Sequence, residues 1–277
     1  MHNFTKTALL IVQNVYFRIM KITHFKNINS TNSYLQNLLD NGEDVIDNVV
    51  VADFQTSGKG QGKNIWQSEE GKNLLFSIAL DMSFLKAEDQ FLLTQIVSVS
   101  MVEVLKKYLP EESLFIKWPN DIYFNDKKIA GILIKNEIKG MMMGTSIIGI
   151  GLNVNQTSFD ENLPNPISMK MITGKDYDLE ILLKEICDKI SQQTTVNRQQ
   201  TSSNSIGSTF NFQLSTFNFQ HLYIDKLYHY KQWALYEHEG ELKEMMIVGY
   251  DRFGRLILKE KNGREVVCDL KEVKFIV

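Results

Sequence analysis

The residues best suited to chemistry lie between Phe115 and Leu133, in the run FIKWPNDIYFNDKKIAGIL. Its cations are Lys117, Lys127 and Lys128. Lysines this close together, in two predicted strands joined by a polar turn, are suited to hold an anion. Because proline fits a β run only at an edge, a bulge or a strand end, Asn120 and Asp121 should lie where the first strand stops. From spacing alone, a solvated hairpin is an equally good interpretation.

A second cluster of glycines and lysines follows a predicted strand. Residues 55–66 read QTSGKGQGKNIW and come directly after the apolar run from Val49 to Phe54. Glycines let backbone N–H groups approach an anion closely, and Lys59 and Lys63 would supply the countercharge. The segment is not a P-loop, because Ser57 stands where that motif requires its first glycine. It therefore predicts an anion-binding loop of another kind.

Apolar periodicity predicts the elements that must position these residues. Strands are predicted at 22–25, 49–54, 74–80, 114–118, 129–138 and 141–153, and helices from about 31, at 91–109, at 179–190 and at 221–236. Ser30 or Thr31 should cap the first helix, which Asn41 and Gly42 should end. From Glu241 onward, short strands alternate with turns, which is typical of a small barrel.

Six motifs, taken in order, resemble those of the biotin protein ligase family. They are STN at 30–32, QTSGKGQGKNIW at 55–66, GKNLLFSI at 71–78, KWPND at 117–121, KKIAGIL at 127–133 and GIGLNVN at 149–155. The resemblance is strong over roughly residues 20–155. The tail from 239 to 277 resembles the small C-terminal β-barrel of the family, and the stretch between is less similar.

The resemblance implies an α+β fold with two domains. The larger one would be a biotin ligase catalytic domain of the class II aminoacyl-tRNA synthetase type, a mixed sheet with helices, and the smaller one an SH3-like β-barrel. We expect residues 1–19 to be an N-terminal extension, 20–238 the catalytic domain and 239–277 the barrel. The polar stretch at about 192–220, in which STFNFQ occurs twice, should be an inserted loop without a catalytic role.

The resemblance also implies a role for individual residues. The expected biotin-binding residues are Ser30, Thr31, Asn32, Gln55, Gly58, Lys59, Gly60, Lys128 and Gly131. The expected nucleotide-binding residues are Lys59, Gln61, Trp66, Lys117, Asn120 and Asn153. The expected catalytic cations are Lys59, Lys117 and Lys128. Asp121 would be a ligand of the Mg²⁺ ion that enters with ATP, with Asn153 beside it, and no tightly bound cofactor is implied.

Two positions in the glycine loop depart from the family's pattern. Lys59 stands where the family usually has arginine, and Gln61 stands where some members have a second arginine. Lysine keeps the charge but loses the bidentate fork of a guanidinium. This departure therefore bears on how firmly the reaction intermediate is held.

The activity implied by the resemblance is ATP-dependent attachment of biotin to a lysine of a biotin carboxyl carrier protein. Two alternatives stay open. A lipoate or octanoate ligase or transferase of the same superfamily would also modify a carrier lysine. A biotin-responsive repressor would need a helix-turn-helix domain, whereas about thirty residues precede the STN triplet. We therefore expect the monofunctional type.

Composition limits the partners and the compartment. A net charge of -3 argues against nucleic acid as the main partner, since duplex-binding proteins usually carry a basic face. Cys187 and Cys268 are too few for a disulfide framework, so a reducing, cytoplasmic compartment is expected. The apolar run that begins at Ala8 is interrupted by Gln13 and is too short to span a membrane. Both a monomer and a homodimer are compatible with the sequence.

Overall fold

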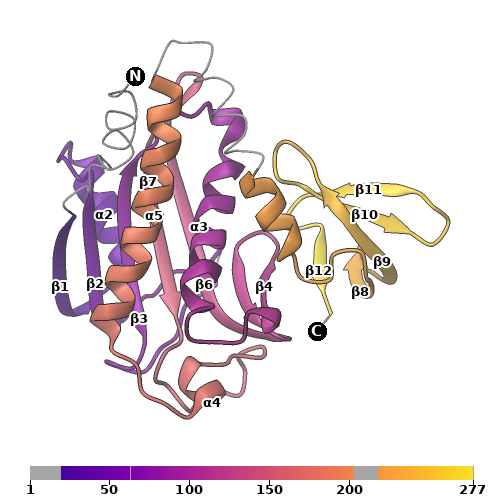
Figure 1. The fold of residues 1–277 in the computed structure, drawn as a ribbon, viewed down its shortest axis with the longest axis horizontal. Helices are drawn as coiled ribbons and strands as arrows, with labels where there is room; N and C mark the ends of the chain where they lie inside the picture. Colours follow the sequence, from indigo (N-terminus) through magenta and orange to yellow (C-terminus); the bar gives the residue numbers. More distant parts are fainter. Residues whose placement is uncertain (1–19, 63, 203–217, 277) are drawn as a thin grey trace, which may run out of the picture.

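The computed structural model describes residues 20–62, 64–202 and 218–276, which form two β-sheets and the helices around the larger one (Figure 1). The predicted N-terminal extension, residues 1–19, lies outside this description, as do residues 203–217 of the predicted loop. None of the described helices combines the length and the apolar composition needed to cross a bilayer.

The larger sheet has seven strands in the order β1-β2-β3-β7-β6-β5-β4. They are β1 (Lys21–Ile28), β2 (Asn48–Gln55), β3 (Leu74–Asp81), β4 (Leu114–Lys117), β5 (Asp121–Phe124), β6 (Lys127–Lys139) and β7 (Met142–Leu152). β1 and β2 run parallel and the other neighbouring pairs antiparallel, so the sheet is mixed as expected. This order puts three of the sequence motifs on adjacent strands, because β7 lies between β3 and β6.

Helices cover both faces of this sheet. α2 (Thr31–Asp40) packs on one face, where Leu35 contacts a cluster that includes Val50, Ala79 and Ile147. α3 (Phe91–Leu105) and α5 (Leu179–Ser202) pack against each other, and their apolar residues join the main core on the opposite face. The chain also contains the short helices η1 (Ala87–Asp89), η2 (Glu111–Ser113) and α4 (Met169–Thr173).

The start and end of α2 follow from local sequence. The Ser30 hydroxyl accepts a hydrogen bond from the Ser33 backbone N–H, and Asn41 is the C-cap, so both predicted helix ends are confirmed. The helix predicted at 91–109 ends earlier than expected, at Leu105. The chain continues there in turns before Pro110.

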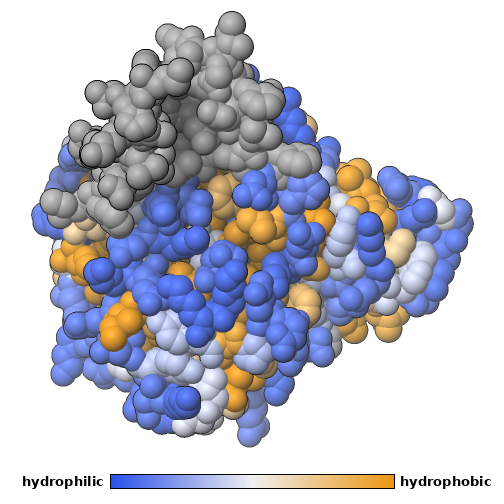
Figure 2. All heavy atoms as spheres, viewed as in Figure 1, coloured by the Kyte–Doolittle hydropathy of each residue, from blue (hydrophilic) through white to orange (hydrophobic). Residues whose placement is uncertain are grey.

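The smaller sheet is antiparallel, with five strands in the order β11-β10-β9-β8-β12. They are β8 (Trp233–His238), β9 (Glu241–Tyr250), β10 (Leu256–Glu260), β11 (Glu265–Cys268) and β12 (Val273–Phe275). The expected small β domain is therefore present. In the view of Figure 2 its surface, like that of the larger domain, is mostly polar, with apolar side chains in separate patches.

Three boundaries in the C-terminal half differ from the predictions. The helix predicted at 221–236 is wrong, because helix covers only residues 218–225 and Trp233–His238 is strand β8. The small sheet therefore begins before the expected boundary at residue 239. The predicted loop start near 192 is also wrong, because α5 continues to Ser202. The corrections at β8 have one cause, because its pairing with β9 and β12 overrides a weak local pattern.

Candidate functional site

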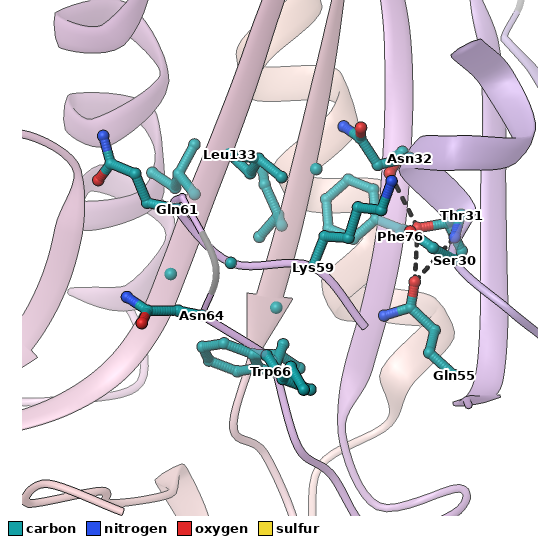
Figure 3. Close-up of a pocket in the computed structure, with 18 of the residues that line it drawn as sticks. Ser30, Thr31, Asn32, Gln55, Lys59, Gln61, Asn64, Trp66, Phe76 and Leu133 are labelled. Carbon is teal, nitrogen blue, oxygen red and sulfur yellow. Dashed lines mark hydrogen bonds between the residues drawn. The ribbon is translucent and has the colours of Figure 1, made fainter. Parts of the chain in front are cut away.

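A cavity of about 140 Å³ opens on the α2 side of the large sheet, beneath the glycine loop (Figure 3). Its walls come from the start of α2, the end of β2, the glycine loop and strands β3, β5, β6 and β7. The sequence-predicted residues that line it are Ser30, Thr31, Asn32, Gln55, Lys59, Gly60, Gln61, Trp66, Asp121, Lys128 and Gly131. The fold thus brings together most of the predicted site residues from five separate segments.

One end of the cavity is a network of polar side chains. The Thr31 backbone N–H donates to Gln55 Oε1 at 2.8 Å, and the Thr31 hydroxyl lies 3.2 Å from the same oxygen and 2.8 Å from the Ser77 hydroxyl. Asn32 is buried beside them, and neither polar atom of its side-chain amide has a hydrogen-bond partner in the described structure. Buried polar groups are normally paired, so this end of the cavity is suited to a compact ligand that carries both donors and acceptors.

The floor of the cavity is a strip of glycines. Gly149, Gly151 and Gly131 lie on neighbouring strands, with Gly151 paired directly to Gly131. A Cβ atom at Gly151 would lie 2.4 Å from the Trp66 indole, and one at Gly131 would lie 2.9 Å from it. The indole therefore rests on backbone, and the glycines leave room for flat groups above the sheet.

The glycine loop folds over this floor as a small hairpin. The backbone N–H of Trp66 donates to the Gly58 carbonyl at 3.0 Å, and the backbone N–H of Gly60 donates to the Asn64 carbonyl at 2.8 Å. Lys59 and Ile65 form a β-bridge. Figure 3 shows the Lys59 side chain crossing the cavity toward Asn32. The loop thus places an ammonium group over the polar end of the site.

Lys128 lies between this cavity and a second one. The second cavity, of about 260 Å³, adjoins the first and shares Asn64, Ile65, Trp66 and Lys128 with it. The Lys128 ammonium lies 2.7 Å from the Asp121 carboxylate and 5.7 Å from the centre of a Trp66 ring. Asn153 also lines the second cavity, and its buried Oδ1 atom has no partner among the described residues. A cation at this junction can stabilise negative charge that develops between two bound ligands.

Three predicted site residues line neither cavity. The Lys117 ammonium contacts the Tyr123 hydroxyl at 3.0 Å and lies 5.0 Å from the centre of the Phe275 ring. Burial lowers the pKa of Lys117, and the Asp121 carboxylate opposes this shift. The Asn120 side chain donates to the Ile132 carbonyl at 2.6 Å. Gly58 instead lies against Trp66, where a Cβ would be 2.4 Å from its carbonyl oxygen.

The sequence analysis missed several residues of the first cavity. They are Asn64, Ile65, Phe76, Ser77, Ile132, Leu133, Gly149, Ile150 and Gly151. Ser77, Gly149 and Gly151 lie inside motifs that were already recognised, and the two-residue period of a strand would have put the two glycines on one face. The missing information was the strand order, which places Ser77 directly opposite Gly149.

The described residues include no group of three or more His, Cys, Asp or Glu side chains that could hold a metal ion. The carboxylate predicted as a magnesium ligand, that of Asp121, forms an ion pair with Lys128. The donor set therefore does not fit a resident metal site.

Comparison with known proteins identifies the larger domain. Residues 24–153 match the model of the biotin/lipoate A/B protein ligase family. This part of the chain is therefore similar to that family. The bifunctional ligase/repressor BirA of Bacillus spizizenii is 36% identical over 143 residues, which cover 50% of this chain and 43% of that protein. Biotin–protein ligase 1 (chloroplastic) of Arabidopsis thaliana is 36% identical over 145 residues, which cover 50% of this chain and 37% of that protein. The chain thus spans less than half the length of these curated relatives.

Solved structures extend the likeness beyond the ligase-family domain. The biotin protein ligase from Aquifex aeolicus in complex with biotin and ATP superposes with a TM-score of 0.71 at 24% identity, covering 93% of this chain and 99% of that one. The biotin protein ligase from Leishmania major in complex with biotinyl-5-AMP gives a TM-score of 0.56 at 21% identity, over 91% and 100% of the two chains. The expected fold, a biotin ligase domain followed by a small β domain, is therefore confirmed.

Proposed function

We propose that this protein is an ATP-dependent biotin protein ligase, which forms biotinyl-5'-AMP and transfers the biotinyl group to a lysine of a biotin carboxyl carrier domain. The observation that carries the proposal is the position of Lys128, at the junction of a cavity with a polar end and a second cavity lined by Trp66 and Asn153. Two cavities that meet at a cation suit a reaction that joins two anionic substrates.

In this proposal biotin occupies the first cavity with its ureido ring at the polar end. Its ureido ring carries N–H donors and a carbonyl acceptor, which match the Thr31, Gln55 and Ser77 network and the unpaired amide of Asn32. The fused rings would then lie between this network and the Trp66 indole, and the carboxylate would point toward Lys128. Ser30 would act indirectly, because its hydroxyl caps the helix that presents Thr31.

ATP would occupy the second cavity. An aromatic ring such as that of Trp66 favours contact with a purine, and the unpaired Oδ1 of Asn153 is placed to accept from an exocyclic amino group. A biotin carboxylate oxygen would attack the α-phosphorus, and pyrophosphate would leave with the bonding electrons. Lys128 and Lys59 would offset the charge of this transition state, in which positioning and countercharge dominate catalysis.

The predicted roles of the remaining residues stay proposals. Lys117 carries no carboxylate partner within ion-pair distance in the described structure, which suits a later contact with phosphate. Gln61, Gly58 and Gly60 would shape the loop over the intermediate. Magnesium would enter on the nucleotide, because Mg²⁺ is usually bound through substrate phosphates with only one or two carboxylates.

In the second half-reaction, the amine of a carrier lysine would attack the acyl carbon of the adenylate, and AMP would leave. The partner is then a folded carrier domain and not a nucleic acid or a membrane. The reducing, cytoplasmic compartment belongs to the same proposal, and both cysteines are buried free thiols.

The proposal predicts that the purified protein, with MgATP, transfers biotin and not lipoate to a biotin carboxyl carrier domain. The mass of the carrier and the release of pyrophosphate, measured separately with each acid, check this result. The matched control is the same assay with lipoate and a lipoyl carrier domain. Equal transfer of lipoate would assign the chain to the lipoate or octanoate branch of the family.

Replacing Thr31 with valine is expected to weaken biotin binding about tenfold or more, because an unpaired buried polar group costs about 1–3 kcal/mol. The change keeps the size of the side chain but leaves the Ser77 hydroxyl without this partner. Calorimetry with biotin alone measures the effect. The control is Thr56→Val, whose hydroxyl bonds to Asn29 outside both cavities. Equal affinities for the two variants would place the ureido group elsewhere.

A further inference from the structure

The KWPND motif connects the small β domain to the candidate catalytic lysine. Asp121, its last residue, pairs with the Lys128 ammonium at 2.7 Å. Of the other motif residues, Trp118 and Pro119 line neither of the two cavities. Their contacts lead toward the C-terminal half of the chain.

Each residue of the turn between β4 and β5 is held by a different element. The Trp118 indole N–H donates to the Gly254 carbonyl, in the turn between β9 and β10, at 2.7 Å. The Tyr223 hydroxyl, from the helix at residues 218–225, donates to the Pro119 carbonyl at 2.7 Å. The Asn120 amide donates to the Ile132 carbonyl of β6. The turn therefore has one attachment to the small domain, one to the segment that leads into it and one to the wall of the site.

The turn lies at the outer end of the large sheet. β4 and β5 have four residues each, and β5 pairs with β6, so β4 and the turn are the outermost part of the sheet. The outer edge of β4 is covered by the segment that leads into the small domain, because Ile116 exchanges backbone hydrogen bonds with Lys226 and Tyr228. Figure 1 shows β4 beside this segment, at the end of the large sheet nearest to the small domain.

The contact at Gly254 is also closely packed. Gly254 has a φ of +83°, and a Cβ there would lie 2.3 Å from the Phe91 ring. Phe91, Tyr223 and Tyr250 pack edge to face around it, with ring centroids 5.2 to 5.6 Å apart. These rings come from α3, from the 218–225 helix and from β9. The Gly254 carbonyl, which accepts the Trp118 hydrogen bond, therefore has a fixed position.

We infer that the small β domain is a positioning element for the adenylation reaction: through Trp118 and Tyr223 it holds the β4–β5 turn, which aims Asp121 and thereby the Lys128 ammonium. This inference rests on the proposed function. It makes Trp118 and Tyr223 positioning residues, since neither lines the two cavities.

The first test is a double-mutant cycle. Trp118→Phe keeps a ring and removes the donor, and it should lower single-turnover adenylation about ten- to hundredfold, as small misplacements of reacting groups do. The biotin Kd should stay within about twofold, because the ureido contacts lie at the other end of the cavity. In combination with Asp121→Asn, the Trp118→Phe loss should largely disappear, because both changes act on the same ion pair.

Arg252→Ala is the matched control for the domain interface. Arg252 pairs with Glu88 and Asp89 of η1 and does not contact the turn, so its removal should leave adenylation unchanged. An equal loss in Arg252→Ala would overturn the inference, and so would independent, multiplicative losses from Trp118→Phe and Asp121→Asn. If Trp118→Phe does not fold by circular dichroism, Tyr223→Phe takes its place in the same cycle.

A second readout needs neither biotin nor ATP. Lys128 is partly buried against the Asp121 carboxylate, which restricts access to its amine, so brief treatment with acetic anhydride should label Lys128 less than the exposed Lys127. Trp118→Phe should raise the Lys128 to Lys127 labelling ratio, measured by mass spectrometry, and Arg252→Ala should not. An unchanged ratio would refute the positioning role. Absence of adenylation in the wild type would refute only the proposed function.

Discussion

Replacing Lys128 with alanine is expected to lower the rate of adenylate formation about a hundred- to thousandfold, the range seen when a preorganised electrostatic donor is removed. Lys128 is the cation shared by the two cavities, and its partner Asp121 already aims it there. Negative charge on the attacking carboxylate and the α-phosphoryl group would develop beside it. Biotin affinity should change less, because the Thr31 and Gln55 contacts lie at the opposite end of the cavity.

Single-turnover release of pyrophosphate is the measurement that checks this expectation, since it excludes carrier binding and product release. Lys127→Ala is the control, because Lys127 is the exposed neighbour on the same strand and lines neither cavity. If Lys128→Ala and Lys127→Ala form the adenylate at similar rates, Lys128 has no catalytic role and is only a hairpin lysine paired with Asp121.

Features of the fold that depend on neighbouring residues could be predicted from the sequence. The beginning of α2 is an example, because the Ser30 hydroxyl needs only the Ser33 backbone N–H to cap the helix. The other large-sheet strands were also predicted from their apolar runs, but β5 (Asp121–Phe124) was not. The successful predictions rest on sequence patterns that lie within a few positions of the residue concerned.

The β8 strand could not be predicted in this way. Its first part, from Trp233 to Tyr236, was assigned to the end of a helix, but the backbone of β8 pairs with β9 on one side and β12 on the other. Tyr236, for example, pairs with Phe275, which comes from strand β12 at the other end of the small domain's sequence. A six-residue apolar pattern does not separate strand from helix until these distant partners are known.

The candidate site shows the same division between residue type and placement. The family resemblance selected both Lys117 and Lys128 as catalytic cations, because both lie in motifs. The structure places Lys128 between two cavities and Lys117 against Tyr123 and Phe275. Phe275 comes from the last strand of the chain, so nothing near Lys117 in the sequence indicates this packing. Gly149 and Gly151 were not selected as site residues, because their role depends on the strands that lie beside β7.

Replacing Gly151 with alanine is expected to lower adenylation about a hundredfold, as a misplacement of about 1 Å in an active site can. The added Cβ would lie 2.4 Å from Trp66 Cε2 and 2.8 Å from Cδ2, so the indole would have to move away from the sheet. Trp66 lines both cavities, and its displacement would change the space for biotin and for the nucleotide together.

The matched control is Gly249→Ala, a glycine of strand β9 where an added Cβ would meet nothing within 4 Å. Single-turnover adenylation and biotin calorimetry on both variants separate a blocked floor from a general cost of alanine in a strand. Rates for Gly151→Ala that match those for Gly249→Ala would mean that the indole has a second, equally productive position. The glycine floor would then serve strand packing, and Trp66 would not define the junction at which the two substrates meet.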